Sequence, residues 1–375
     1  MLGHFYPLRP LMEALRAVGD EVGIATNGPL LGTPETDGFT RFKVGLDDDD
    51  PIIIHQRNVL ATLPPTEIRR RAFTEWFVKA EVPKRVKDLR AAVESFKPDL
   101  VVHEAAEFAG PIAATAHGVP YATHSFGPLV PPDITALAGE AAAPLWQEHD
   151  LEPHPTAGLY EHLYLDICPP SLQIPAVRDL KAIQPIGQPT TAVSGGELSW
   201  LDDFDGRPIV YVSLGTVWNR DPEVFNLLLD ATRGQEINVV VTVGAANDPS
   251  MLGPQPPDVA VHRFVPQQLL LPRCSAVITH GGAGSVLGAL SFGLPLVVVP
   301  QSADHFYNAS LISAAGAGEW IAPADLSVDA VRSALRRILD QPTYRDAALR
   351  IKGEFDAMPQ PADVRPRLVE LATRR

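Results

Sequence analysis

Short apolar runs alternate with segments of helical periodicity along the whole chain. Such runs, bounded by turn residues, are typical of buried strands, and helices between them are typical of parallel sheets. The predicted strands are 22–25, 39–44, 99–103 and 119–123 in the first half, and 209–214, 239–243, 259–264, 276–279 and 294–299 in the second. The pattern therefore predicts an α/β fold whose parallel sheets are covered by helices.

Helical periodicity is clearest in two segments of the first half. Residues 7–18 place apolar side chains on one face, and Gly19 ends the helix. Residues 67–96 form a predicted helix that is interrupted near Pro83. Residues 129–162 are rich in Pro and Ala, and we expect them to lie outside both sheets as a wall or lid of a pocket.

The two halves repeat the same rhythm, so we expect two doubly wound Rossmann-like domains that face each other across a cleft. A length of 375 residues also exceeds the usual size of one compact domain. The predicted organisation is an N-terminal domain over 1–190, a Gly-containing linker over 191–207, a C-terminal domain over 208–352 and a C-terminal helix over 353–375 that packs back on the first domain.

Composition and charge exclude several classes of partner. The chain carries 31 Lys and Arg against 45 Asp and Glu, a net charge of −14, without a basic stripe, which argues against nucleic acid and anionic membranes. Cys168 and Cys274 are the only cysteines, and no zinc-like spacing is present, so we expect no metal site. Because signal-peptide and membrane-span patterns are also absent, the expected location is the cytoplasm.

The most informative segment follows the predicted strand 276–279. It is a Gly-rich turn that leads into a helix and consists of His280, Gly281, Gly282, Ala283, Gly284 and Ser285. Unpaired backbone N–H groups and the positive end of the helix meet at such a turn and attract an anion. His280 and Ser285 add side-chain donors, so the segment predicts a phosphate site. The alternative is a tight turn that needs glycine only for packing.

A second turn follows the strand 209–214, with Ser213, Gly215 and Thr216 as candidate ligands. This motif is short and weak by itself. We expect it to contact the other side of a diphosphate if the sheet order brings the two turns together.

Three segments together resemble the donor signature of one enzyme family. They are Phe264-Val265-Pro266-Gln267, the turn from His280 to Ser285, and Pro300-Gln301-Ser302-Ala303-Asp304-His305. Their order and spacing are similar to those of the inverting nucleotide-sugar-dependent glycosyltransferases of the natural-product (antibiotic) type, which have the GT-B fold. The resemblance implies that Phe264, Val265 and Gln267 hold the base, that the Gly-rich turn holds the diphosphate, and that Asp304 and His305 bind sugar hydroxyls. Many relatives have Gln where this chain has His305.

One departure from the plant-type pattern concerns the donor nucleotide. Plant-type members have a Glu eight residues after the phosphate-binding His, where it binds both ribose hydroxyls, whereas this chain has Gly288. A donor without the 2′-hydroxyl does not need that carboxylate, so we expect thymidine diphosphate (TDP) sugars to be preferred over uridine diphosphate (UDP) sugars. Gly288 is otherwise a residue that packs a helix.

The N-terminal segment Gly3-His4-Phe5-Tyr6-Pro7 supplies the candidate base. A His that titrates near neutrality is suited to accept the proton of a hydroxyl, and it needs a carboxylate to orient it. Glu104, at the end of the strand 99–103, is the first candidate and Glu107 the second. The resemblance implies the same roles, because GHxxP looks like the family's catalytic turn. A strand should precede this turn. We expect it to lie in a segment outside this sequence; the alternatives are a different start of the chain and the loss of this strand from the first domain.

The expected enzyme is an inverting glycosyltransferase that moves a sugar, expected to be a deoxysugar, from a TDP donor to a hydroxyl of a small apolar natural product. We expect neither a metal nor a cofactor beyond the nucleotide sugar; a homodimer is one option for its assembly. The N-terminal domain is expected to bind the acceptor through Phe5, Tyr6, Trp76, Phe77, His124 and Phe126. The alternatives are a nucleotide-sugar epimerase of similar fold and an inactive binding homologue.

Overall fold

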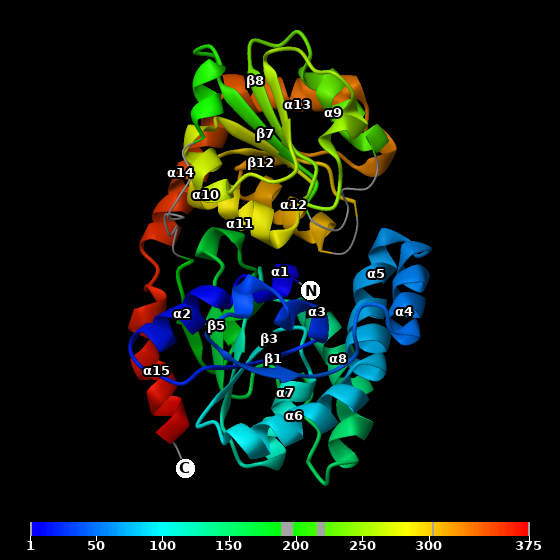
Figure 1. Cartoon of the computed structure of the whole chain (residues 1–375), viewed down its shortest axis with the longest axis vertical. Coiled ribbons are helices and arrows are strands. Elements are labelled where there is room, and N and C mark those ends of the chain that lie inside the picture. The colour runs from blue at the N-terminus through cyan, green and yellow to red at the C-terminus, as the bar shows by residue number, and fades with distance from the viewer. Residues whose placement is uncertain (1, 189–197, 216–221, 302–303, 374–375) are drawn as a thin grey trace. The chain divides into compact units, whose positions relative to one another are not determined.

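The computed structural model of the chain describes residues 2–188, 198–215, 222–301 and 304–373. These residues form two compact units. The first comprises Met1–Cys168, Gln173–Pro189 and Met358–Arg375, and the second comprises Pro169–Leu172 and Thr190–Ala357. Each unit is a parallel α/β structure, as the alternating pattern predicts (Figure 1).

The first unit contains two parallel sheets among its described residues. Strands β1 (Gly23–Thr26) and β2 (Thr40–Lys43) pair with each other. A second sheet has the order β3-β4-β5-β6, from β3 (Val101–Glu104), β4 (Tyr121–His124), β5 (Leu163–Asp166) and β6 (Ile183–Pro185). The four strands predicted in this half are confirmed within two residues at their ends, whereas β5 and β6 were not predicted.

The helices of the first unit are α1 (Leu2–Phe5), α2 (Arg9–Ala17), α3 (Gly28–Leu31), α4 (Pro51–Ala61), α5 (Pro65–Arg71), η2 (Ala72–Ala80), α6 (Val82–Phe96), α7 (Ala109–Ala116), α8 (Pro132–Gln147) and α15 (Pro361–Thr373). The segment η2 is a π-helix, in which the Glu81 N–H bonds back to the Trp76 carbonyl. The predicted interruption near Pro83 is confirmed, because α6 begins at Val82 directly after this π-helix.

The expectation that 129–162 lies outside both sheets is confirmed, because this described segment contains α8 and turns and no strand. Helix α8 is nevertheless part of the core. Trp146 of α8 is fully buried and belongs to the same apolar core as Phe108 and Ile112 of the α7 region. Gly139 allows this helix to approach the following loop, because a Cβ at this position would lie 1.9 Å from the Pro155 carbonyl oxygen. The Ala-rich composition therefore reflects close helix packing.

The described residues of the second unit form one six-stranded parallel sheet in the order β12-β11-β10-β7-β8-β9. Its strands are β7 (Ile209–Ser213), β8 (Asn238–Thr242), β9 (Val259–His262), β10 (Ala276–Thr279), β11 (Leu296–Val298) and β12 (Gly318–Trp320). All five predicted strands are present, and only the short β12 was not predicted. This is the doubly wound order, which reverses direction between β7 and β10 and creates a switch point there.

Helices cover both faces of this sheet. They are α9 (Pro222–Thr232), α10 (Gln267–Leu270), α11 (Ala283–Ser291), α12 (His305–Ala314), α13 (Val328–Asp340) and α14 (Pro342–Asp356). Figure 1 shows α9 and α13 on one side of the sheet and α11 and α12 on the other. The fully buried β7 and β8 form the centre of the core.

The C-terminal helix α15 belongs to the first unit, where it packs against α2. Arg365 of α15 donates hydrogen bonds of 2.7 and 2.6 Å to the two carboxylate oxygens of Asp20.

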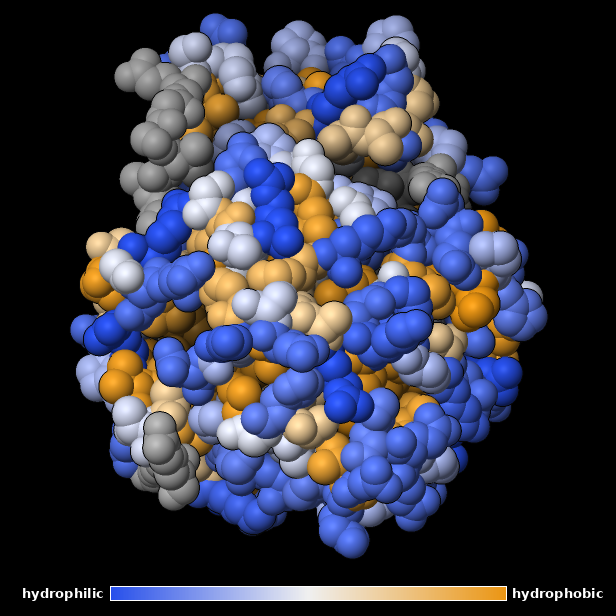
Figure 2. All heavy atoms as spheres, turned by 60° about the horizontal axis from the view of Figure 1, so that its bottom comes forward, coloured by the Kyte–Doolittle hydropathy of each residue, from blue (hydrophilic) through white to orange (hydrophobic). Residues whose placement is uncertain are grey.

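On the face drawn in Figure 2, hydrophilic side chains surround small groups of apolar ones. Within the described residues, no helix has both the length and the apolar character needed to span a membrane.

Candidate functional site

Two turns meet at the switch point of the second unit. Strands β7 and β10 are neighbours, and the register pairs Ser213 with Thr279 at their carboxyl ends. The turn after Ser213 and the Gly-rich turn after Thr279 therefore lie side by side, which fulfils the condition set by the sequence. The Ser213 hydroxyl accepts a hydrogen bond from the Gly215 N–H at 3.3 Å and holds its own turn. Thr216 lies outside the described residues.

The imidazole of His280 lies between two glycines. A Cβ at Gly215 would be 2.5 Å from His280 Cε1, and a Cβ at Gly282 would be 2.5 Å from His280 Nε2. Gly215 also has φ +74°, a conformation that L side chains rarely adopt. These two glycines therefore make room for the histidine ring, in addition to allowing close approach of a ligand.

His280 is buried and electrically neutral in this environment. Burial, together with the neighbouring His305, lowers the pKa of His280 to about 3, against the opposite effect of Asp304. The two imidazoles meet edge to face with ring centroids 4.5 Å apart. His280 is therefore suited to donate a hydrogen bond to a phosphate oxygen from a neutral ring, and it adds no full positive charge.

The positive electrostatic potential at this turn comes from the N-terminus of α11. Gly282 is the N-cap residue, with φ −62° and ψ 140°, and among the described residues no side chain caps this end. The first intrahelical bond runs from the Val286 N–H to the Gly282 carbonyl, so the preceding N–H groups of Ala283, Gly284 and Ser285 remain available. An unpaired first turn of this kind is a binding site for a phosphate group.

Asp304 and His305 lie at the start of α12. Asp304 accepts a hydrogen bond of 2.9 Å from Asn308, which also donates to the Gly281 carbonyl at 2.8 Å. His305 is buried, and its Nδ1 accepts from the Gln301 N–H at 3.3 Å. Asn308 joins the Gly-rich turn to Asp304 and was not identified from the sequence, although its spacing of one helical turn after Asp304 was a usable signal.

The turn that follows β9 combines exposed and buried residues. The Phe264 side chain is 70% exposed, whereas Val265 is buried. Gln267 begins α10 and donates to the Tyr211 hydroxyl at 3.5 Å. A Cβ at Gly288 would lie 3.3 Å from the Gln267 side-chain oxygen. Gly288 therefore faces the turn that contains Gln267.

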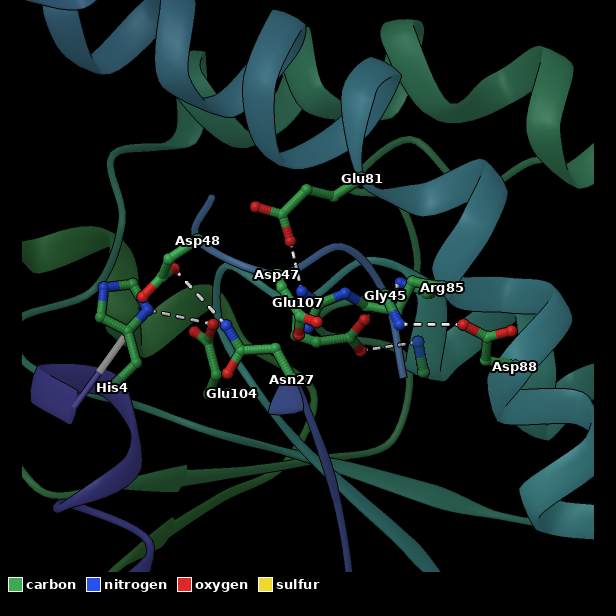
Figure 3. A network of polar contacts seen from close by, with 12 residues as sticks. His4, Asn27, Gly45, Asp47, Asp48, Glu81, Arg85, Asp88, Glu104 and Glu107 are labelled. Atoms are coloured by element: carbon green, nitrogen blue, oxygen red, sulfur yellow. Dashed lines mark hydrogen bonds and ion pairs between the residues drawn. The ribbon is translucent and has the colours of Figure 1, made fainter. Parts of the chain in front are cut away.

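In the first unit, His4 and Glu104 form a direct pair (Figure 3). The His4 Nδ1 lies 3.0 Å from a carboxylate oxygen of Glu104, and the two side chains are 23% and 18% exposed. The other carboxylate oxygen accepts from the Ala106 N–H at 2.5 Å. Burial raises the pKa of Glu104, but its interactions with His4 and Ala106 outweigh burial, and the pKa lies below its usual value. Glu104 is thus ionised and orients the ring.

Glu107, the second candidate for the partner of His4, lies elsewhere in the local structure. It accepts hydrogen bonds from the N–H groups of Ala109 and Gly110 at 3.0 and 2.6 Å, at the start of α7. Burial raises its pKa. Glu107 therefore caps a helix and does not contact His4.

The predicted acceptor residues fall into two groups. Phe77 and Phe126 contact His4, with ring centroids at 6.3 and 4.3 Å, and Trp76 contacts Phe77. The other three residues have different surroundings. Phe5 is buried in a core cluster of its own, Tyr6 is 44% exposed and donates to Glu35, and His124 is fully buried with its Nδ1 on the Ser125 carbonyl.

Comparison with known families agrees with this arrangement of turns. The model of the erythromycin biosynthesis protein CIII-like N-terminal domain matches residues 13–215, and the corresponding C-terminal domain model matches residues 226–371. The chain belongs to the EryCIII-like glycosyltransferase family. The prediction of a natural-product glycosyltransferase is thereby confirmed, and the protein is an enzyme that transfers glycosyl groups.

Named relatives of this EryCIII-like chain cover almost its full length. It is 34% identical to the L-demethylnoviosyl transferase of Streptomyces niveus over 97% of this chain and 94% of that protein. It is 31% identical to the elloramycin glycosyltransferase ElmGT of Streptomyces olivaceus over 98% of this chain and 94% of that protein. The family is one of natural-product deoxysugar transferases.

A solved structure extends the agreement to the fold. The glycosyltransferase VinC in complex with DTDP has a TM-score of 0.79 with 24% identity, covering 100% of this chain and 98% of that one. The EryCIII-like chain therefore has the predicted GT-B fold, built from two Rossmann-like domains.

Proposed function

We propose that the protein is an inverting glycosyltransferase that moves a deoxysugar from a TDP donor to a hydroxyl group of a small apolar natural product. The observation that carries the proposal is the His4–Glu104 pair, an imidazole whose Nδ1 is held by an ionised carboxylate. Nε2 is then the nitrogen that receives a proton from the acceptor hydroxyl.

The proposed reaction is a single displacement. The acceptor O–H proton moves to His4 Nε2, and the acceptor oxygen forms a bond to the anomeric carbon of the sugar. The bond from this carbon to the diphosphate oxygen breaks at the same time, and its electron pair leaves with the diphosphate. Attack opposite the leaving group inverts the configuration, and Glu104 stabilises the imidazolium that is formed.

The donor is assigned to the second unit, at the turns that flank β7 and β10. The His280 ring and the N–H groups at the start of α11 are suited to stabilise the leaving diphosphate without a bound metal. Gly288 supports a deoxynucleotide, because it faces Gln267 and offers no carboxylate for a 2′-hydroxyl. VinC, a protein of the same fold, was solved in complex with DTDP.

The acceptor is assigned to the first unit, around the aromatic group that surrounds His4. Phe77 and Trp76 present partly buried aromatic rings beside the base, which suits an apolar aglycone. The sugar hydroxyls are assigned to Asp304 and His305, of which Asp304 is held by Asn308.

The decisive experiment pairs a panel of TDP and UDP sugars with polyketide and aromatic acceptors. The product mass identifies the transfer, and the anomeric coupling constant in the proton NMR spectrum of the product identifies its configuration. We expect β-linked product from an α-linked TDP donor. Transfer from UDP sugars alone would contradict the donor assignment, retention of configuration would contradict the single displacement, and full-rate transfer by His4→Ala would contradict the base.

A further inference from the structure

His4 stands on a helix that cannot orient it alone. Helix α1 has four residues, and a single helical turn has little stability of its own. The Glu104 carboxylate fixes Nδ1, but one hydrogen bond leaves the ring plane free to turn about the line between the two groups. The direction of Nε2 therefore depends on what contacts the faces of the imidazole.

One face of the ring is covered by Phe126. The two rings are stacked, with centroids 4.3 Å apart and planes inclined by 11°. Phe77 adds an edge contact at 6.3 Å and 70°. The sequence predicts both residues for the acceptor pocket, and the structure shows that Phe126 in addition stacks directly on the imidazole.

The aromatic contacts continue into the core of the unit. Phe77 packs edge to face on Phe73 at 5.4 Å, and Phe73 packs on Phe108 at 6.0 Å. Phe73 and Phe108 are both buried. Phe126, in the segment after β4, is itself half-buried against the same core cluster. The two rings that contact the imidazole are thus themselves packed against the core of the unit.

We propose that Phe126 is a positioning residue for the base: its ring fixes the plane of the His4 imidazole and favours the imidazolium formed during transfer. The electron-rich face of an aromatic ring attracts a cation, which supplies the second effect. This inference rests on the proposed role of His4, and it assigns to Phe126 a function other than binding the acceptor.

The test compares Phe126→Leu, which removes the ring at similar volume, with Phe126→Tyr, which keeps it. We expect Phe126→Leu to lower kcat about tenfold, with an acceptor KM within about twofold of the wild type. We expect Phe126→Tyr to keep the wild-type kcat. Phe126→Met provides a second ring-free variant if the leucine variant does not fold. A raised acceptor KM with unchanged kcat would overturn the proposal and make Phe126 a wall of the acceptor pocket.

A spectroscopic measurement tests the stack without relying on activity. The carbon-bound ring protons of His4, assigned by comparison with His4→Ala, are expected to be shifted upfield by the Phe126 ring current. We expect Phe126→Leu to abolish this shift and Phe126→Tyr to retain it. If His4→Ala transfers at full rate while the ring-current shift is present, the base assignment fails and the stack stands. If the shift is absent from the wild type, the positioning role fails by itself.

Discussion

The packing of His280 between two glycines makes Gly282→Ala a sharp test of the donor site. The added Cβ would lie 2.5 Å from His280 Nε2, and φ at this residue is −62°, so the backbone accepts alanine without strain. The cost comes from the clash with a buried ring. Overpacking of this kind costs about 1 to 3 kcal/mol, and alanine at an N-cap adds about 0.5 kcal/mol.

Gly284→Ala provides the matched control in the same turn. No heavy atom lies within 4 Å of a Cβ at Gly284, which is the second residue of α11. Alanine inside a helix is favoured over glycine by about 0.5 to 1 kcal/mol. We therefore expect the ligand-free control to melt at or above the wild-type temperature. Gly282→Ala should melt about 3 to 14 °C lower, at about 2 to 4 °C per kcal/mol for a unit of this size.

Calorimetric titration with TDP measures how Gly282→Ala changes the affinity of the donor site. Loss of one hydrogen bond to a charged phosphate is expected to weaken TDP binding by Gly282→Ala about tenfold or more. Equal melting temperatures for the two ligand-free variants, together with wild-type affinity for TDP in Gly282→Ala, would refute the reasoning. A stable Gly284→Ala that binds TDP weakly would show that the ligand occupies the open space at this residue.

Three further predictions address the first unit and the expectation that transfer needs no metal ion. Glu104→Gln should lower kcat about 100-fold or more. The control Glu107→Gln, at a helix cap, should change the melting temperature and leave kcat within about threefold of the wild type. Equal losses of kcat in the two variants would argue against the pairing of His4 with Glu104. Burial raises the pKa of Asp166 to about 6, despite hydrogen bonds from the Cys168 N–H and Gln173, so the folded state favours the protonated acid and its stability falls as the pH rises from about 4 to 6. In urea unfolding, Asp166→Asn should therefore gain up to about 3 kcal/mol relative to the wild type across this interval, and a pH-independent difference would contradict the assignment. EDTA should leave the transfer rate unchanged, and a loss restored by magnesium would contradict metal-independent departure of the diphosphate.

Local pattern was sufficient for the elements with a strong signal. The strands that contain Ser213 and Thr279 are apolar runs that lead into Gly-containing turns, so their positions, and the link from the second strand to α11, follow from the sequence. The three strands that were not predicted are β5, β6 and β12. Length alone does not explain this, because the predicted β10 also has four residues, but β6 (IQP) and β12 (GEW) each contain a single large apolar residue and therefore form no apolar run.

The sequence by itself determined the family, the Gly-rich turn, and the choice of His4 and Glu104 as partners, because each depends on residue type and spacing along the chain. Only the tertiary structure decided what surrounds these groups. It placed Gly215 and Gly282 against the ring of His280, moved Glu107 to a helix cap, and stacked Phe126 on His4. These contacts join residues from separate strands and helices, and their geometry follows from sheet order and core packing, which the spacing of residues along the chain does not specify.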